Sequence, residues 1–442
     1  MRGRVLLIVM LAATAGRAQV APSATGGFAG SQTQMMTPPP VSGAGYATEV
    51  GAEERTNYVR GGVSTATAYI SNLYPGGSGP SLAETTVSVL PTVALDSTSV
   101  RQHALFTYSP GFTFYQPSSV LNEVDNTATV RYDFRLTEHA TLSSSDSFRD
   151  SSLPFIPGDA SAGGTVSGLP ESSTPGIVPP FAKMLTNSAN VELTVQTALN
   201  AMIGGYGLET EQHYPNPAQT PGLFDSSSRG GSAFLNRRIS LSQYFGATYQ
   251  YLDMLAGSAS ETFATQTHTI SGYYTFYPKA KVSLSVAGGP QYFRIIETPL
   301  PAMGSWGPSV SASMGWQGMR TSFAVGYTQA VTGGGGLFGA YHSKSATATA
   351  SWQMARNWIA SASGAYSINK PISSLLITEE PGGHSVSGSA TLVRTLGNQF
   401  SVMFEYDRLH ESYEGIAAIA ANPDSNRGTI SIIWRFQRPL GR

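Results

Sequence analysis

The sequence predicts an all-β protein: a transmembrane antiparallel up-and-down β-barrel of about sixteen strands, preceded by a disordered N-terminal segment. Three observations support this fold class. After Arg101, runs of about ten residues alternate apolar with small polar side chains, as strands with two different faces do. The connections between these runs alternate in length. Only 12% of residues are charged, whereas soluble domains carry about 25%.

The N-terminus predicts export. Arg2 and Arg4 form a basic start, Val5 to Ala15 is apolar, and Gly16-Arg17-Ala18 is a small-x-small cleavage site. We therefore expect residues 1–18 to be a signal peptide, because the apolar run falls short of the roughly 20 residues that a spanning helix needs. Cysteine is absent from the chain, which excludes a lipid-modified N-terminal cysteine, disulfides and thiolate metal sites.

Residues 19–85 are rich in Gly, Pro, Ser, Thr and Ala and show little periodicity. This composition predicts a flexible periplasmic leader, with a plug or a cell-wall contact as alternatives. Thr86 to Leu95 is β-like, but Pro91 interrupts it, so it is interpreted as a lead-in or lumen-lining segment rather than a barrel strand. The barrel is assigned to residues 86–442.

The alternating runs separate apolar from small polar residues. In one run Val310, Ala312, Met314 and Trp316 share a face opposite Ser309, Ser311, Ser313 and Gly315. A soluble sandwich would carry Lys and Glu on its polar face, because that face meets bulk water. Ser, Thr and Gly instead favour the interior of a barrel whose apolar face meets lipid.

Short connections fix the strand number. Six short turns and a weaker hairpin near Ile239 to Ser242, with one opening and one closing strand, give about sixteen strands, and fourteen to eighteen also fit an even-numbered barrel. The longest connection, Ser151 to Ser188, is stiffened by several prolines, and we expect it to fold into the lumen as a constriction. The six turns lie at residues 137–139, 199–200, 277–281, 317–320, 354–357 and 396–398.

The last run, Thr429 to Phe436, resembles the C-terminal strand signal by which outer-membrane barrels are recognised. Thr429, Ser431, Trp434 and Phe436 occupy its polar, small and aromatic places. From residue 86 onward the chain also resembles the loosely defined barrel-porin group of Gram-negative bacteria. The resemblance implies an outer-membrane location, contact with outer-membrane lipid and recognition by the barrel-assembly machinery.

Charged residues on the small polar face are the candidate site, because an ionisable group within a membrane span needs water or a partner. They either neutralise one another as a structural network or line a water-filled channel. Three arginines against four acids indicate no preference for either ion sign. By parity along the runs, these residues are Arg131, Asp133, Arg135, Glu192, Glu405, Asp407 and Arg435.

The leading functional hypothesis is a porin-like channel for passive diffusion of small hydrophilic solutes. The alternatives are a non-conducting structural or surface-binding barrel and an outer-membrane component of polysaccharide export. A hydrolase is a third alternative with little support, because no motif frames Ser387 and the nearby His384. We expect no cofactor, no metal and, since 26 basic residues balance 27 acidic ones, no nucleic-acid partner. A homo-oligomer is left open.

Overall fold

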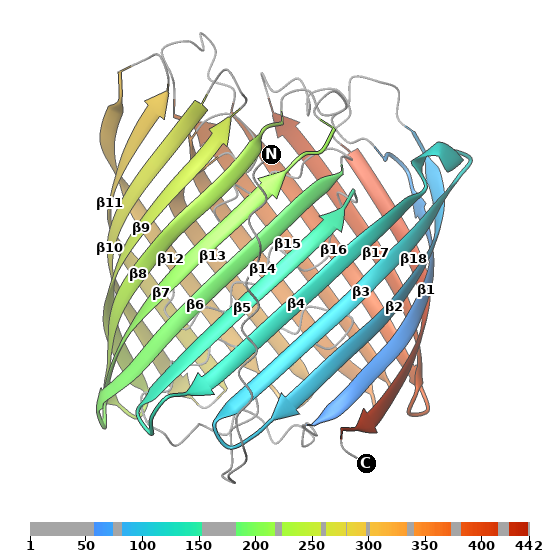
Figure 1. Cartoon of the computed structure of the whole chain (residues 1–442), viewed down its shortest axis with the longest axis horizontal. Coiled ribbons are helices and arrows are strands. Elements are labelled where there is room, and N and C mark those ends of the chain that lie inside the picture. Colours follow the sequence, from blue (N-terminus) through green and yellow to red (C-terminus); the bar gives the residue numbers. More distant parts are fainter. Residues whose placement is uncertain are drawn as a thin grey trace.

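Alternating side chains build a closed wall of 18 antiparallel strands in which each strand pairs with its neighbours in the sequence (Figure 1). The computed structural model describes residues 57–73, 82–152, 183–216, 223–257, 262–279, 281–297, 301–333, 340–372, 382–413 and 424–440. Within these ranges the only helical element is the short 3-10 turn Ser119–Leu121, and no helix there is long and apolar enough to cross a membrane.

The strands run β1 (Tyr58–Ile70), β2 (Glu84–Thr98), β3 (Gln102–Gln116), β4 (Glu123–Arg135), β5 (Ala140–Ser151), β6 (Met184–Ala198), β7 (Ala201–His213), β8 (Asp225–Ser240), β9 (Gln243–Gly257), β10 (Thr262–Lys279), β11 (Val282–Glu297), β12 (Met303–Gln317), β13 (Thr321–Gly333), β14 (Ala340–Ala355), β15 (Trp358–Pro371), β16 (Gly383–Leu396), β17 (Phe400–Tyr413) and β18 (Asp424–Pro439).

The first and last strands close the barrel. β1 pairs along its whole length with β18, from Tyr58 opposite Pro439 to Ile70 opposite Arg427, and equally with β2 on its other side. A closed sheet has no edge, so the backbone of every strand can find hydrogen-bond partners inside the wall. This closure is what allows strands to cross a membrane.

The two ends of the barrel differ. Short turns join β2 to β3 and each later even-numbered strand to its successor, and the described termini meet at this same end, where Leu440 N donates to Asn57 O at 2.7 Å. We call it the turn end. Longer connections lie at the opposite end, the loop end. Outer-membrane barrels keep short turns on the periplasmic side and longer loops outside, which orients the molecule.

The predicted barrel architecture is confirmed, but the strand number is 18 and not about sixteen. The seven predicted short connections are all present, and the eighth, between β2 and β3, was missed. β1 lies inside residues 19–85, which the composition assigned to a flexible leader. Its outward positions include Gly61, Thr65 and Thr67, which give little apolar signal. Residues 1–56 lie outside the described ranges, so the signal peptide and the rest of the leader remain predictions.

A proline explains why β2 was not recognised as a barrel strand from its sequence pattern. Pro91 stands opposite Pro110 of β3, and the regular pairing of these strands is interrupted there, between Val89 and Val93. A proline lacks the N–H that a ladder needs, so two facing prolines remove both donors at one point. A side-chain hydroxyl replaces one of the missing donors, because Ser109 Oγ donates to Pro91 O at 3.1 Å. Thr86 to Leu95 is therefore a barrel strand and not a lead-in.

The residues of the predicted C-terminal signal all lie on the closing strand. Thr429 and Ser431 face inward and are buried, whereas Trp434 and Phe436 face outward with ring centroids 5.5 Å apart. The Phe436 ring lies over Gly61 of β1, where a Cβ atom would collide with it. The aromatic ring thus covers the backbone of the glycine across the closing pair, a device known to support glycine in strands.

We predict that removing residues 19–56 leaves a barrel that folds, whereas removing residues 19–70 abolishes folding, because the second deletion takes away β1 and leaves β2 and β18 with free edges. Heat-modifiable migration in SDS gels after refolding into lipid measures this difference. A folded band from the longer deletion would contradict the assignment of β1 as the closing strand.

Candidate functional site: the lumen wall

The two faces of the wall differ in chemistry. Large apolar side chains occupy the outward positions, such as Ile270 at 59% and Val286 at 57% exposed in the isolated chain. The inward positions beside them are polar, including Thr269 and Ser285, which are buried. We call these the outer face and the lumen face. A closed barrel with an apolar outer face and a polar lumen face is the architecture of outer-membrane barrels.

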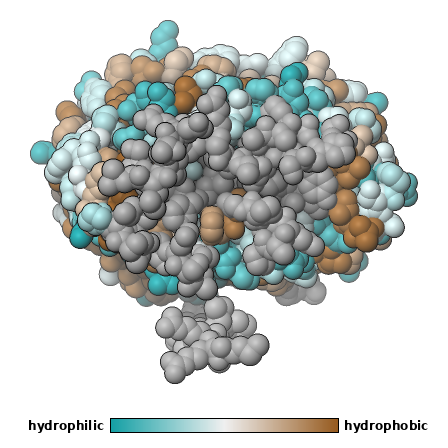
Figure 2. All heavy atoms as spheres, turned by 90° about the horizontal axis from the view of Figure 1, so that it is seen from above, coloured by the Kyte–Doolittle hydropathy of each residue, from teal (hydrophilic) through white to brown (hydrophobic). Residues whose placement is uncertain are grey.

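Viewed from the loop end, the described residues form an oval ring in which hydrophilic and hydrophobic residues are mixed (Figure 2). The apolar outer face therefore belongs to the side wall and not to this end of the molecule. Charged groups placed on that side wall would cost free energy in lipid, whereas the lumen face can hold them next to water or to one another. The register places the seven predicted charged residues on the lumen face: Arg131, Asp133, Arg135, Glu192, Glu405, Asp407 and Arg435.

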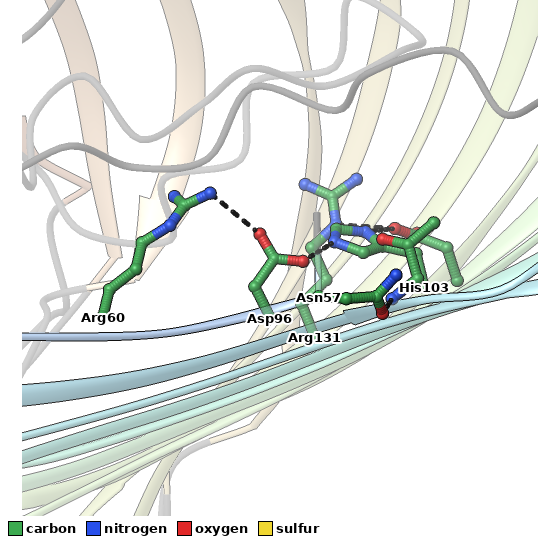
Figure 3. A network of polar contacts seen from close by, with 7 residues as sticks. Asn57, Arg60, Asp96, His103 and Arg131 are labelled. Atoms are coloured by element: carbon green, nitrogen blue, oxygen red, sulfur yellow. Dashed lines mark hydrogen bonds and ion pairs between the residues drawn. The ribbon is translucent and has the colours of Figure 1, made fainter. Parts of the chain in front are cut away.

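Four neighbouring strands carry a connected chain of charges near the turn end (Figure 3). Arg60 of β1 pairs with Asp96 of β2 at 3.2 Å, and Asp96 contacts His103 Nε2 of β3 at 3.1 Å. On β4, Asp133 lies 3.5 Å from His103 Nδ1 and 3.2 Å from Arg131 Nε. The labelled side chains lie on one side of the strands, toward the barrel interior. We call this set the turn-end network.

His103 connects the two halves of the turn-end network. Both of its ring nitrogens face carboxylate oxygens, Nε2 toward Asp96 and Nδ1 toward Asp133. A carboxylate only accepts hydrogen bonds, so the His103 ring can only donate to Asp96 and Asp133. Beyond the two acids lie the guanidinium groups of Arg60 and Arg131, which form the ends of the network.

Of the predicted residues, Glu192 of β6 also joins this region, since it interacts electrostatically with Arg131 and Asp133. Glu405 and Asp407 form a second group on β17, where Asp407 stands directly opposite Arg427 of β18. The structure therefore brings Arg131, Asp133 and Glu192 together and keeps Glu405 and Asp407 apart from them.

The other two predicted residues lie near the turn end. Arg135 ends β4, and Arg435 of β18 is opposite Gly62 of β1, with its side chain over that glycine.

Sequence reasoning missed three of the five residues of the turn-end network. Arg60 and Asp96 lie on β1 and β2, which were not recognised as barrel strands, so no parity could be assigned to them. His103 is the second residue of β3, at a boundary where the alternation starts. Arg427 was not assigned to either face, because the last run was taken to begin at Thr429; extending the alternation of Thr429 and Ser431 by one step would have found it.

The loop ends of β13 and β14 leave the wall and enter the lumen. β12 and β13 pair only as far as Val310 opposite Gln329, so the upper part of β13 is paired with β14 alone. Gln291 of β11 instead reaches past β12 to the backbone of Val331. Its Nε2 donates to Val331 O at 3.2 Å, and its Oε1 accepts from Val331 N at 2.8 Å. Farther along, Gly333 N donates to Met254 Sδ of β9 at 3.0 Å.

Apolar packing holds these strand ends against the lumen face of the nearby strands β10 and β11. Val331 and Ala340 are fully buried with Phe263 of β10 and with Phe293 and Ile295 of β11. His342 and Val331 of the two strand ends lie over Gly307 of β12, within van der Waals reach of the position that a Cβ would take. We call residues 330–333 and 340–342 the inturned tip; it narrows the lumen from the β9–β12 side.

The inturned tip differs from the predicted constriction. The sequence pointed to Ser151 to Ser188, but residues 153–182 of that segment lie outside the described ranges, so a constriction there remains a prediction. The described residues that do enter the barrel at the loop end, Thr332, Gly333 and Ala340, belong to a different connection. The sequence signal that could have revealed this is the apolar character of Phe293 and Ile295 on an otherwise polar face.

The structure also separates the pair considered for hydrolysis. Ser387 and His384 occupy odd and even positions of β16, so Ser387 faces the lumen and His384 the outer face, where its ring lies 5.6 Å from that of His410. Within the described ranges, no three His, Asp or Glu side chains are grouped so that they could hold a metal ion.

No protein-family model matches the sequence, and a search of curated proteins finds no match. Among solved structures, OccAB4 of Acinetobacter baumannii is 10% identical, with 87% of this chain and 99% of that chain covered and a TM-score of 0.43. The outer membrane protein OpdK of Pseudomonas aeruginosa is 9% identical over 86% of this chain and 99% of its own, with a TM-score of 0.43.

The FrpB iron transporter of Neisseria meningitidis is 11% identical and has a TM-score of 0.42; the match covers 81% of this chain but only 62% of FrpB. At these scores the likeness carries no weight for fold or function. The barrel is established by the strand pairing of this chain itself.

We predict that Asp96→Ala destabilises the barrel, because Arg60 and His103 lose a shared carboxylate that is almost fully buried. Hydrogen bonds to charged groups contribute about 1.5–3 kcal/mol each, and the loss should fall near the lower end since Arg60 is partly exposed. Urea unfolding in lipid vesicles, followed by tryptophan fluorescence, measures it. Arg135→Ala, at the end of β4, is the control and should change stability little. Equal effects of the two substitutions would contradict a cooperative network.

We predict that Gln291→Ala loosens the inturned tip, since it removes two hydrogen bonds to the Val331 backbone, about 1–3 kcal/mol of anchoring in total. A spin label or fluorophore at position 332 should gain mobility. Gln250→Ala, a lumen-facing glutamine on β9, is the matched control and should leave the tip unchanged. A tip that stays ordered in Gln291→Ala would show that the apolar packing alone holds it.

Proposed function

We propose that the protein is an outer-membrane channel of porin type, through which small hydrophilic solutes diffuse passively. The observation that carries the proposal is the wall of 18 strands, apolar outside and polar inside. Barrels of 16 to 18 strands are wide enough to leave an aqueous passage, whereas those of about eight strands are filled by their own side chains.

The lumen face supports passage of water-soluble molecules. Half-buried hydroxyls such as those of Thr347, Thr349 and Ser361 line it. The inturned tip narrows the loop-end half, as expected of a channel that selects by size and not of an unobstructed pore. Diffusion through such a channel needs no chemical step, and we assign no catalytic residue.

The test is single-channel conductance in planar bilayers, for the refolded full-length mature chain and for a variant lacking residues 19–56. Steady conductance steps from both would support a channel that is open in the resting state. Steps from the truncated form alone would support a channel that the N-terminal segment occludes. Silence from both, with a correctly folded barrel by heat modifiability, would overturn the proposal in favour of a structural or surface-binding barrel.

We predict that a channel narrowed by the inturned tip conducts more when the tip is released. Gln291→Ala should therefore raise the single-channel conductance, while Gln250→Ala should not. If the conductance of Gln291→Ala equals that of the unmodified protein although the label at position 332 has become mobile, the narrowest point lies elsewhere in the lumen.

A further inference from the structure

The described charges of the lumen face are concentrated in one half of the wall. They lie on β17, β18 and β1 to β6, eight neighbouring strands across the closing pair, with Arg238 of β8 as the only described addition. On β9 to β16 no described side chain of the lumen face is Asp, Glu, Lys or Arg. We call the two halves the charged wall and the hydroxyl wall.

The two walls face each other across the lumen. β12, in the middle of the hydroxyl wall, is half of the 18-strand ring away from β3, in the middle of the charged wall. Figure 1 shows this arrangement, with β3 to β6 in front and β12 to β16 behind. A solute in the lumen therefore has charges on one side and uncharged hydroxyls on the other.

The charged wall is acidic on balance. In the turn-end network Asp96 pairs with Arg60 and Asp133 pairs with Arg131, and farther toward the loop end Arg427 interacts with Glu405 and Asp407. The nine described acids of its lumen face stand against six arginines, so the wall repels an anion in the lumen and attracts a cation. The acids are Glu84, Asp96, Glu123, Asp125, Asp133, Glu192, Glu405, Asp407 and Glu411, and the arginines are Arg60, Arg131, Arg135, Arg149, Arg427 and Arg435.

The hydroxyl wall offers a regular grid of hydrogen-bonding groups. Successive lumen-facing residues are about 7 Å apart along a strand and about 5 Å apart between strands. Several of these hydroxyls already pair with one another across strands, as Ser363 does with Ser389 at 2.6 Å and Ser367 with Ser385 at 2.7 Å. A hydroxyl both donates and accepts, so it can meet the hydroxyls of a solute in either role.

From this division we infer that the channel favours small uncharged polyhydroxylated solutes, of the size and chemistry of monosaccharides, over anions of similar size. Such solutes can exchange hydrogen bonds with water for hydrogen bonds with the hydroxyl wall at little net cost. An anion gains no comparable compensation there, because the described hydroxyl wall carries no countercharge and the excess acids of the charged wall repel it. The inference rests on the proposed channel function.

The experiment compares three solutes of nearly equal size in proteoliposome efflux: glucose, its cationic amine glucosamine and its anionic acid gluconate. We expect glucose and glucosamine to leave faster than gluconate, and the reversal potential in a KCl gradient to have the sign of a preference for K⁺ over Cl⁻. A gluconate efflux as fast as that of glucose, or a reversal potential of the opposite sign, would overturn the inference. Vesicles without any conductance or efflux would instead overturn the channel function itself.

Variants of the two walls localise the effect. The double substitution Thr347→Val and Thr349→Val removes two hydroxyls from the hydroxyl wall with little change in volume. It should slow glucose efflux about two- to tenfold, the equivalent of about one hydrogen bond, while KCl conductance stays the same. The matched control, Thr127→Val with Thr129→Val on β4 of the charged wall, should leave glucose efflux unchanged. Equal slowing by both pairs would show that the hydroxyl wall has no special role.

Discussion

The whole structure depends on one requirement: within lipid, the peptide groups of each strand must find partners inside the protein. The chain meets it by pairing β1 with β18, which removes both edges of an 18-strand sheet. Closure also fixes which side chains face the lumen, because a shift of one residue in the register would turn every side chain to the other face. The contact of Phe436 with Gly61 lies across this closing pair and covers the backbone of that glycine.

Because the wall is rigid, the side chains of its lumen face determine which solutes the barrel can accept. Alternation alone would distribute polar groups evenly round the lumen, yet the described charges gather on eight strands, whereas the described polar side chains on the lumen face of the opposite eight are uncharged. The inturned tip belongs to the hydroxyl wall, where Gln291 and the cluster around Phe293 anchor it. Narrowing and hydrogen bonding therefore act on the same side of the lumen, while the charged wall is tied together by His103 and its two carboxylates.

Most of the barrel could be predicted from period-2 alternation, because the outer and lumen faces impose opposite chemistry on neighbouring residues. β1 and β2 were not recognised, for physical reasons. On β1, Gly61, Thr65 and Thr67 weaken the apolar signal of the outer face. On β2, Pro91 suggests the end of a strand, but the strand continues past it, with Pro110 of β3 standing opposite. The lumen charges were located by the same parity. Their partners were not, since ion pairs such as that of Arg60 with Asp96 join strands whose pairing no local pattern records. The inturned tip depends on contacts that skip a neighbouring strand, and local periodicity carries no information on such contacts.

The departure of β13 from the wall has an effect on β12. From Met303 to Ser309, β12 pairs with β11, and no described strand pairs with its other side. A barrel that otherwise has no edge thus presents a short one near the loop end, and an edge strand is a template on which an extended peptide can add. The residues there oppose such addition: Pro308 has no N–H to offer, and Gly304 and Gly307 provide no side chains for a partner strand to pack against. The sequence that lets the tip turn inward also keeps the opened edge of β12 a poor surface for aggregation.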